Sequence, residues 1–218
     1  MDIIEEIKFP STNKDWGLKV LIGGILNMIP IINFLSSGYN LKVMKEAIEN
    51  KPEMPQWGDW GNFFVKGLIA FIISLIYLLI PIIVLLVSLG SMAFAIISGA
   101  VSGDKSMALG AMGGAIGGIL ISLVLMIIFG FLIPMALAMY IREDNISAAF
   151  RFGELLSRIR SVFGEYLTVY IVLIVLSFVL SLFSAVPILG FLIIIFGGFY
   201  IEVVGANMFG KVYAKSTP

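Results

Sequence analysis

The sequence predicts an all-α integral membrane protein with about six helical membrane segments in three hairpins and two interfacial amphipathic helices. Three observations lead to this fold class. Hydrophobic residues make up 60% of the 218 residues and charged residues 13%, whereas an average soluble domain carries about 25% charged residues. Several apolar runs reach the roughly 20 residues that a helix needs to cross a bilayer. The positive charges gather in a few short segments, as loops on the cytoplasmic side of a membrane do.

We expect one helical membrane domain between two short tails. Residues 1–15 contain no apolar core, so we expect a cytoplasmic or interfacial tail and no cleavable signal peptide. The expected bounds are 16–213 for the membrane domain, about 16–50, 63–141 and 164–213 for its hairpins, and 214–218 for the C-terminal tail.

The first hairpin has two alternatives. The apolar stretch 16–37 is long enough for a single span. The other alternative is a short or re-entrant pair, with a helix over about 16–26, a turn around 27–30 and a second helix over 31–48. Three lysines lie before or close to the start of this stretch and three follow it, and only a hairpin keeps both groups on the cytoplasmic side, so we favour the hairpin. The lysines are Lys8, Lys14, Lys19, Lys42, Lys45 and Lys51.

Two segments are expected to lie at the membrane surface. Residues 39–50 place apolar and charged side chains on opposite faces of a helix, and a tryptophan-containing segment follows them. Residues 146–163 repeat apolar side chains at near-helical spacing after a cap at residue 144 or 145. Tryptophan and arginine side chains are typical of the headgroup level. The residues expected there are Trp57, Trp60, Arg151, Arg158 and Arg160.

The second and third hairpins follow from long apolar runs. The second should turn at Gly103-Asp104-Lys105, with residues 98–106 either loop or helix. The third should join spans over 166–183 and 188–208 through a turn without charge. Arginines precede this third hairpin and lysines follow it, so we expect both termini in the cytoplasm and a multi-pass protein of the cell membrane.

Small residues recur at every fourth position in the second hairpin, which on a helix places them along one stripe. In a membrane such a stripe becomes a packing surface, because neighbouring backbones approach closely there. We therefore expect helix pairing, within the chain or between copies. The stripe consists of Ser106, Gly110, Gly114, Gly118 and Ser122.

Glu202 is the most informative polar residue, because it lies inside the last apolar run. A carboxylate at that depth is costly and by default marks an ion or substrate pathway, or a buried partner. Lys66, near the inner end of another span, is a candidate partner, and Asn207 lies five residues further on. Asn27 and Asn33 flank the first turn, where they are expected to cap backbone groups or to line a polar pathway.

Several classes of function find no support. The chain has neither cysteine nor histidine, which removes thiolate and imidazole chemistry and the usual zinc sites. Fourteen basic residues balance fourteen acidic ones, so no nucleic-acid-binding surface is indicated. Serine- and glycine-rich segments lack the partners of a hydrolase or a phosphate-binding loop. We therefore expect no enzyme, no metal and no cofactor.

A short internal repeat links the first and last hairpins. Residues 28–35 (MIPIINFL) match residues 185–192 (AVPILGFL), and in both cases glycine and an aromatic residue follow downstream. Chance is a serious competitor in so apolar a chain. A true repeat would make the two hairpins structurally equivalent, in a parallel arrangement.

The chain also resembles a family of small polytopic membrane proteins, mostly archaeal, that is catalogued as a domain of unknown function. The resemblance covers nearly the whole sequence, although each of its motifs is short. It implies a shared membrane fold and no particular activity. The motifs are Pro30 with Gly38-Tyr39, Pro55-x-Trp57-x-x-Trp60, Lys66-Gly67-Leu68, Tyr77-x-x-x-Pro81, Pro134 through Tyr140, Ala148 through Phe152, Pro187-x-x-Gly190 and Gly210-x-x-Tyr213.

Three functions fit these observations. The first is a non-enzymatic scaffold or assembly subunit, paired with copies of itself or another membrane protein through small-residue faces. The second is a transporter or channel for an ion or small solute, with Glu202 on its pathway. The third is lipid binding by the interfacial helices.

Overall fold

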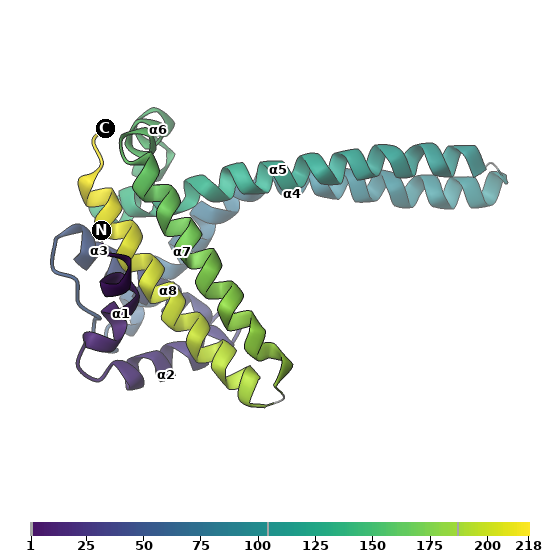
Figure 1. Ribbon diagram of the computed structural model, residues 1–218. Coiled ribbons are helices and arrows are strands. Elements are labelled where there is room, and N and C mark those ends of the chain that lie inside the picture. The colour runs from purple at the N-terminus through teal and green to yellow at the C-terminus, as the bar shows by residue number, and fades with distance from the viewer. Residues whose placement is uncertain (1, 104, 187) are drawn as a thin grey trace. The chain divides into compact units, whose positions relative to one another are not determined.

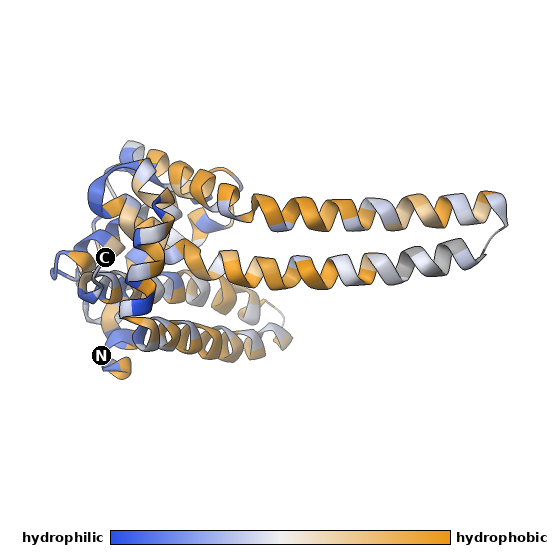
Figure 2. Ribbon diagram, turned by 90° about the horizontal axis from the view of Figure 1, so that it is seen from above, coloured by the Kyte–Doolittle hydropathy of each residue, from blue (hydrophilic) through white to orange (hydrophobic). Residues whose placement is uncertain are grey.

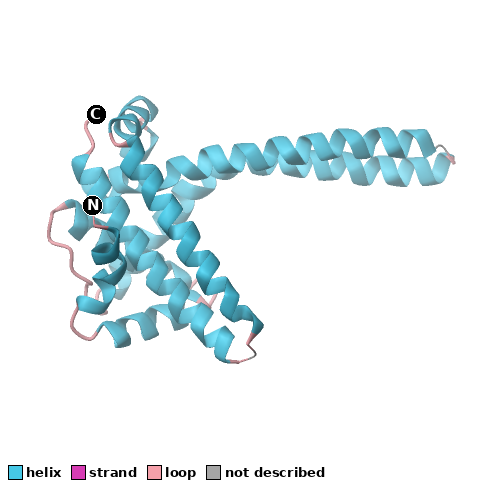
Figure 3. Ribbon diagram, viewed as in Figure 1, coloured by secondary structure: helices cyan, strands magenta, loops and turns pink. Residues whose placement is uncertain are grey.

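The computed structural model describes residues 2–103, 105–186 and 188–218, and in these ranges the chain consists of helices and loops without strands (Figure 3). The all-α class is therefore confirmed. Asp104 of the expected turn and Pro187 of the repeat lie outside the described residues. The helices are α1 (Ile3–Thr12), α2 (Trp16–Asn27), α3 (Asn33–Ile48), α4 (Trp60–Ser102), α5 (Lys105–Glu143), the 3-10 turn η1 (Ile146–Phe150), α6 (Phe152–Ser161), α7 (Phe163–Ser181), the 3-10 turn η2 (Leu182–Ala185) and α8 (Leu189–Lys215) (Figure 1).

Four helices of the described chain are long and apolar enough to cross a membrane, which fits a multi-pass membrane protein. They cover Trp60–Ser102, Gly113–Glu143, Phe163–Ala185 and Leu189–Lys215, and Figure 2 shows the hydrophobic runs along α4 and α5. Helix α2 is apolar too, but its 12 residues extend only about 18 Å. The expected six segments and three hairpins stay predictions.

The chain divides into two compact units. One contains the residues up to Phe71 together with Pro134–Pro218, and the other contains Ile72–Ile133. Helices α4 and α5 contribute to both units.

Helix α8 is the centre of the first unit. It packs against α1, α2, α3 and α7, and every residue from 203 to 210 is buried. Close approach depends on glycine at the crossings. A Cβ atom on Gly24 would lie 2.7 Å from the ring of Phe196, and one on Gly210 would lie 2.5 Å from the carbonyl oxygen of Met44. Any side chain at these positions would push α2 or α3 away from α8.

A reciprocal glycine crossing joins α3 to the first part of α4. A Cβ atom on Gly38 would overlap the carbonyl oxygen of Phe63, and one on Gly67 would overlap the carbonyl oxygen of Phe34. In both helices the glycine follows the phenylalanine by four residues, about one turn. The two backbones therefore touch directly over one turn of each helix, as small residues allow in membrane proteins.

The N-terminal segment, expected as a cytoplasmic or interfacial tail, contains a helix. The side chain of Asp2 caps helix α1 by accepting from the backbone N–H groups of Ile4 and Glu5, and Phe9 is 7% exposed. The helix packs on α8 and α2. Four of the first eight residues are charged, which does not indicate a packed helix. One of them, Glu6, is nevertheless buried and paired.

The first turn follows the favoured alternative of the sequence analysis. Helix α2 ends at Asn27 and α3 begins at Asn33, so residues 16–48 form two helices with a short connection. The amphipathic part of α3 differs from the expectation. Its apolar residues Leu41 and Met44 are 3% and 5% exposed, because α3 packs on α8 within the fold.

The segment expected as one interfacial helix over 146–163 is broken into two. The side chain of Asn145 accepts from the backbone N–H of Ser147 and caps η1, and α6 begins after Arg151, whose backbone is not helical. A second break at Val162 separates α6 from α7. The broken segment changes direction before the span of α7 begins.

The second unit is a hairpin of α4 and α5, whose strongly apolar helices run side by side (Figures 1 and 2). Helix α4 continues to Ser102 and α5 begins at Lys105, so residues 98–102 are helical rather than loop. Gly103 has a φ of +72°, which glycine adopts without strain. The hydroxyl of Ser122 donates to the carbonyl oxygen of Pro81 at 2.8 Å and joins the two helices.

The repeated segments share an unusual backbone feature. Ile31 and Ile188, which are aligned in the two copies, have φ angles of +72° and +62°. Positive φ is rare for a β-branched residue. Helices α3 and α8 begin within two residues of these positions, so the common feature marks the entry into the second helix of each pair.

Candidate functional site

Glu202 is the middle residue of the 27-residue helix α8, thirteen residues from either end. Thirteen residues correspond to about 20 Å of helix, so Glu202 lies near the centre of an apolar segment that is long enough to cross a membrane. Its side chain is at the exposed surface of the helix bundle. A carboxylate at that depth needs strong partners.

Two carboxamides supply these partners from two other helices. The side-chain amide of Asn27 donates to Oε1 of Glu202 at 2.8 Å, and that of Asn40 donates to Oε2 at 2.9 Å. Asn27 is the last residue of α2 and Asn40 lies in the middle of α3. Each carboxylate oxygen retains a lone pair for one further donor. The buried Oδ1 of Asn40 has no hydrogen-bond partner among the described residues.

The glycine crossings position this cluster, which we call the Glu202 site (Asn27, Asn40 and Glu202). Gly23 and Gly24 allow α2 to contact the rings of Phe199 and Phe196 on α8. Asn27 lies one turn after Gly23, and Glu202 lies three residues after Phe199, so the same crossing brings the two polar side chains together.

Asn207 belongs to a second polar cluster, the Glu6 site (Glu6, Asn207 and Lys211), and not to the Glu202 site. Its amide donates to Oε2 of Glu6 at 2.6 Å, and Nζ of Lys211 lies 2.8 Å from both oxygens of that carboxylate. Glu6 is 6% exposed and Asn207 is fully buried. This buried, charge-assisted cluster ties α1 to the last third of α8.

Lys66 also has a partner other than Glu202. Its ammonium group pairs with the carboxylate of Asp144 and lies 5.4 Å from the centre of the Tyr140 ring. The hydrogen bond from Lys66 lowers the pKa of Asp144. The pair joins the early part of α4 to the residue that follows α5, within the first unit. Asn33 is the first residue of α3, and its buried Oδ1 lacks a partner in the described part of the chain.

The small-residue stripe of α5 divides into two parts. Gly118 lies against the side chain of Ser88 in α4, and Ser122 bonds to the backbone of α4. By contrast, a Cβ atom on Gly110 or Gly114 would meet no atom of the described residues within 4 Å. Ser106 is exposed at the start of α5. The hairpin itself therefore uses only the later end of the stripe.

The residues expected at the membrane interface have different surroundings. Trp57 stacks on Tyr39 with ring centres 4.2 Å apart and donates its Nε1 hydrogen to the carbonyl oxygen of Lys19, so it packs within the fold. Trp60 is 44% exposed. Arg151 pairs with Glu143 and Glu154.

Of the other two arginines expected at the interface, Arg158 has an acidic partner and Arg160 has none among the described residues. Arg158 pairs with Glu154 and lies 4.9 Å from the centre of the Tyr213 ring. Arg160 is exposed and makes no ion pair within the described chain. In the same ranges, no group of three or more acidic, cysteine or histidine side chains is arranged to hold a metal ion.

Sequence reasoning missed Asn40 and Glu6. Asn40 lies in a segment that was expected at the membrane surface, where an asparagine needs no explanation. Glu6 lies in the expected tail. For both residues the missing information is the crossing of distant helices on α8, which no local pattern encodes.

A family model described as "Protein of unknown function (DUF4013)" matches residues 22–195 of the chain. No curated protein and no solved structure matches the chain. The match extends from α2 into α8 and includes most of the residues that carry the resemblance noted above.

Proposed function

We propose that this chain, which belongs to the DUF4013 family of proteins of unknown function, is a non-enzymatic membrane scaffold or assembly subunit. Its α5 helix pairs with a second copy, or with another membrane protein, through a glycine face. The observation that carries the proposal is the open space beside four glycines spaced over two turns, Gly110, Gly113, Gly114 and Gly117.

Several glycines on one face lower the stability of a helix, so a face that contacts nothing is not expected to contain them. Each glycine inside a helix destabilises it by about 1 kcal/mol relative to alanine. Gly118 offsets this cost by its contact with Ser88. Apart from the nearby backbone of α5 itself, no atom of the described residues lies within 4 Å of the Cβ positions of the other four. A helix of another molecule would fill this space with close backbone contact. Both termini lie on the cytoplasmic side, because the arginine-rich segment before α7 favours that side.

Single-cysteine cross-linking tests the scaffold proposal. The chain has no native cysteine, so Gly114→Cys gives the only thiol. We expect oxidation in membranes to link Gly114→Cys chains to each other or to a membrane partner. Gly90→Cys on α4 is the matched control, because its Cβ atom also meets no described atom within 4 Å. Gly114→Ile should weaken the oligomer or complex, whereas Gly90→Ile should not. Equal behaviour of the two positions would contradict the proposal.

The Glu202 site favours a second candidate function, transport of a small cation or proton. The site joins a carboxylate at the middle of an apolar helix to carboxamides from two other helices, and polar groups at this depth commonly mark ion pathways. We expect Glu202→Gln to abolish flux of a transported cation in liposomes while the protein remains folded. Glu165→Gln is the control, because Glu165 lies near the start of α7. Unchanged flux in Glu202→Gln would refute this candidate.

A further inference from the structure

Helix α6 has two faces with different surroundings. Leu155 and Ile159 point into the first unit and are 0% and 5% exposed. Phe152 and Leu156 lie on the other face and are 49% and 55% exposed. An amphipathic helix of this kind, directly before a membrane span, lies at the level of the lipid headgroups.

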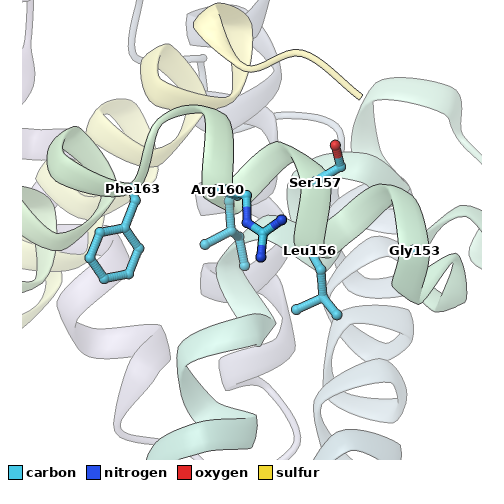
Figure 4. A pocket seen from close by; sticks show the side chains of 6 residues that line it. Gly153, Leu156, Ser157, Arg160 and Phe163 are labelled. Carbon is cyan, nitrogen blue, oxygen red and sulfur yellow. The ribbon is translucent and has the colours of Figure 1, made fainter.

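A surface pocket of about 750 Å³ opens where α6 meets α7. Figure 4 shows Leu156, Arg160 and Phe163 pointing into this region from the two helices. The breaks of helical geometry at Val162 bend the chain here and leave Phe163 52% exposed. The pocket is lined by Gly153, Leu156, Ser157, Ile159, Arg160 and Phe163.

Two arginines close to this pocket have acidic partners. Glu154 and Glu143 neutralise Arg151, and Glu154 also pairs with Arg158. Within the described residues, Arg160 has no acidic partner. A guanidinium without an acidic partner in the described chain therefore lies beside the apolar side chains of Leu156 and Phe163 (Figure 4).

We infer that this pocket binds one anionic phospholipid of the cytoplasmic leaflet. The guanidinium of Arg160 holds the phosphate with two parallel hydrogen bonds. The first part of an acyl chain lies over Leu156 and Phe163. The inference rests on the membrane placement proposed above, but not on helix pairing through α5.

Apparent unfolding temperature in a non-ionic detergent, measured against the mole fraction of added lipid, tests this site. We expect dioleoylphosphatidylglycerol to stabilise the protein and dioleoylphosphatidylcholine not to, because a ligand that binds only the folded state raises its stability. Arg160→Gln should need about fivefold more phosphatidylglycerol for the same shift. Arg142→Gln is the matched control, because Arg142 is an exposed arginine at the end of α5 and its loss changes the net charge equally.

Any of the following three results would contradict the inference. Equal lipid dependence of wild type and Arg160→Gln would mean non-specific attraction. Equal stabilisation by phosphatidylcholine would remove the role of the phosphoglycerol charge. Equal stabilisation by glycerol 3-phosphate, which has no acyl chains, would show a free-anion site without a lipid. Gly114→Ile should bind lipid normally, so failure of this site and failure of the scaffold proposal are distinguishable.

Discussion

The buried Glu6 site gives the sharpest stability prediction. In Glu6→Gln, the side chain keeps its shape and one oxygen that accepts from Asn207, but the charge opposite Lys211 is lost. Removal of one partner of a buried ion pair costs about 3–5 kcal/mol. The Lys211 side chain is 32% exposed, whereas that of Glu6 is 8% exposed, so water solvates part of the orphaned ammonium. We therefore expect a loss of about 2–3 kcal/mol in the free energy of unfolding.

Reversible unfolding in mixed detergent micelles measures this loss. Glu5→Gln is the matched control: Glu5 is an exposed acid on the same helix, and its substitution should change stability by less than about 0.5 kcal/mol. A double-mutant cycle with Lys211→Gln should give a coupling energy of about 1–3 kcal/mol between the two charges. If Glu6→Gln behaves like Glu5→Gln, or the two single effects simply add, the Glu6 site does not hold α1 on α8.

Two further predictions concern the first unit. Gly67→Ala places a methyl group against the carbonyl oxygen of Phe34 and should lower the free energy of unfolding by about 1–3 kcal/mol. Gly61→Ala is the control, because outside its own helix backbone no described atom lies within 4 Å of its Cβ position, and it should leave the free energy of unfolding unchanged or raise it. Equal effects of the two substitutions in the unfolding assay would contradict the close crossing of α3 and α4. Because Lys66 lowers the pKa of Asp144 from 3.8, their ion pair stabilises the fold above that pH and is lost as the pH falls below it. Unfolding temperatures measured across this range should therefore fall less steeply in Asp144→Asn, and an unchanged slope would show that the pair does not contribute.

The helices of the first hairpin could be predicted because charge and chain-breaking residues limit them from both sides. Lysines near both ends of residues 16–48 favoured two helices over one span, and the observed connection between α2 and α3 lies where Asn27 and Pro30 interrupt the apolar run. The all-helical class followed from composition and segment length in the same way. These signals are local, so a single sequence contains them.

The tight glycine crossings could not be predicted from glycine density. Among the glycines of the densest run, in α5, only Gly118 lies within 4 Å of another helix of the described chain, whereas isolated glycines at positions 38, 67 and 210 touch the backbones of other helices. The density of small residues shows that a helix face is accessible, but not what occupies it. The resemblance to the family drew attention to these three isolated glycines, although it gave no physical reason for them.

The hydrogen-bond partners of Glu202 could not be predicted from residue spacing within α8 alone. Helical rise gives the position of Glu202 along α8, because residue number converts directly into distance along a helix. Asn207 is near in sequence, but five residues turn the helix by about 500°, so its side chain points about 140° away from that of Glu202 and reaches Glu6 instead. Asn27 is distant in sequence, but the approach of α2 at Gly23 brings it within 2.8 Å. Neighbours on one helix share a partner only at spacings of three, four or seven residues, and all other partnerships depend on how the helices cross.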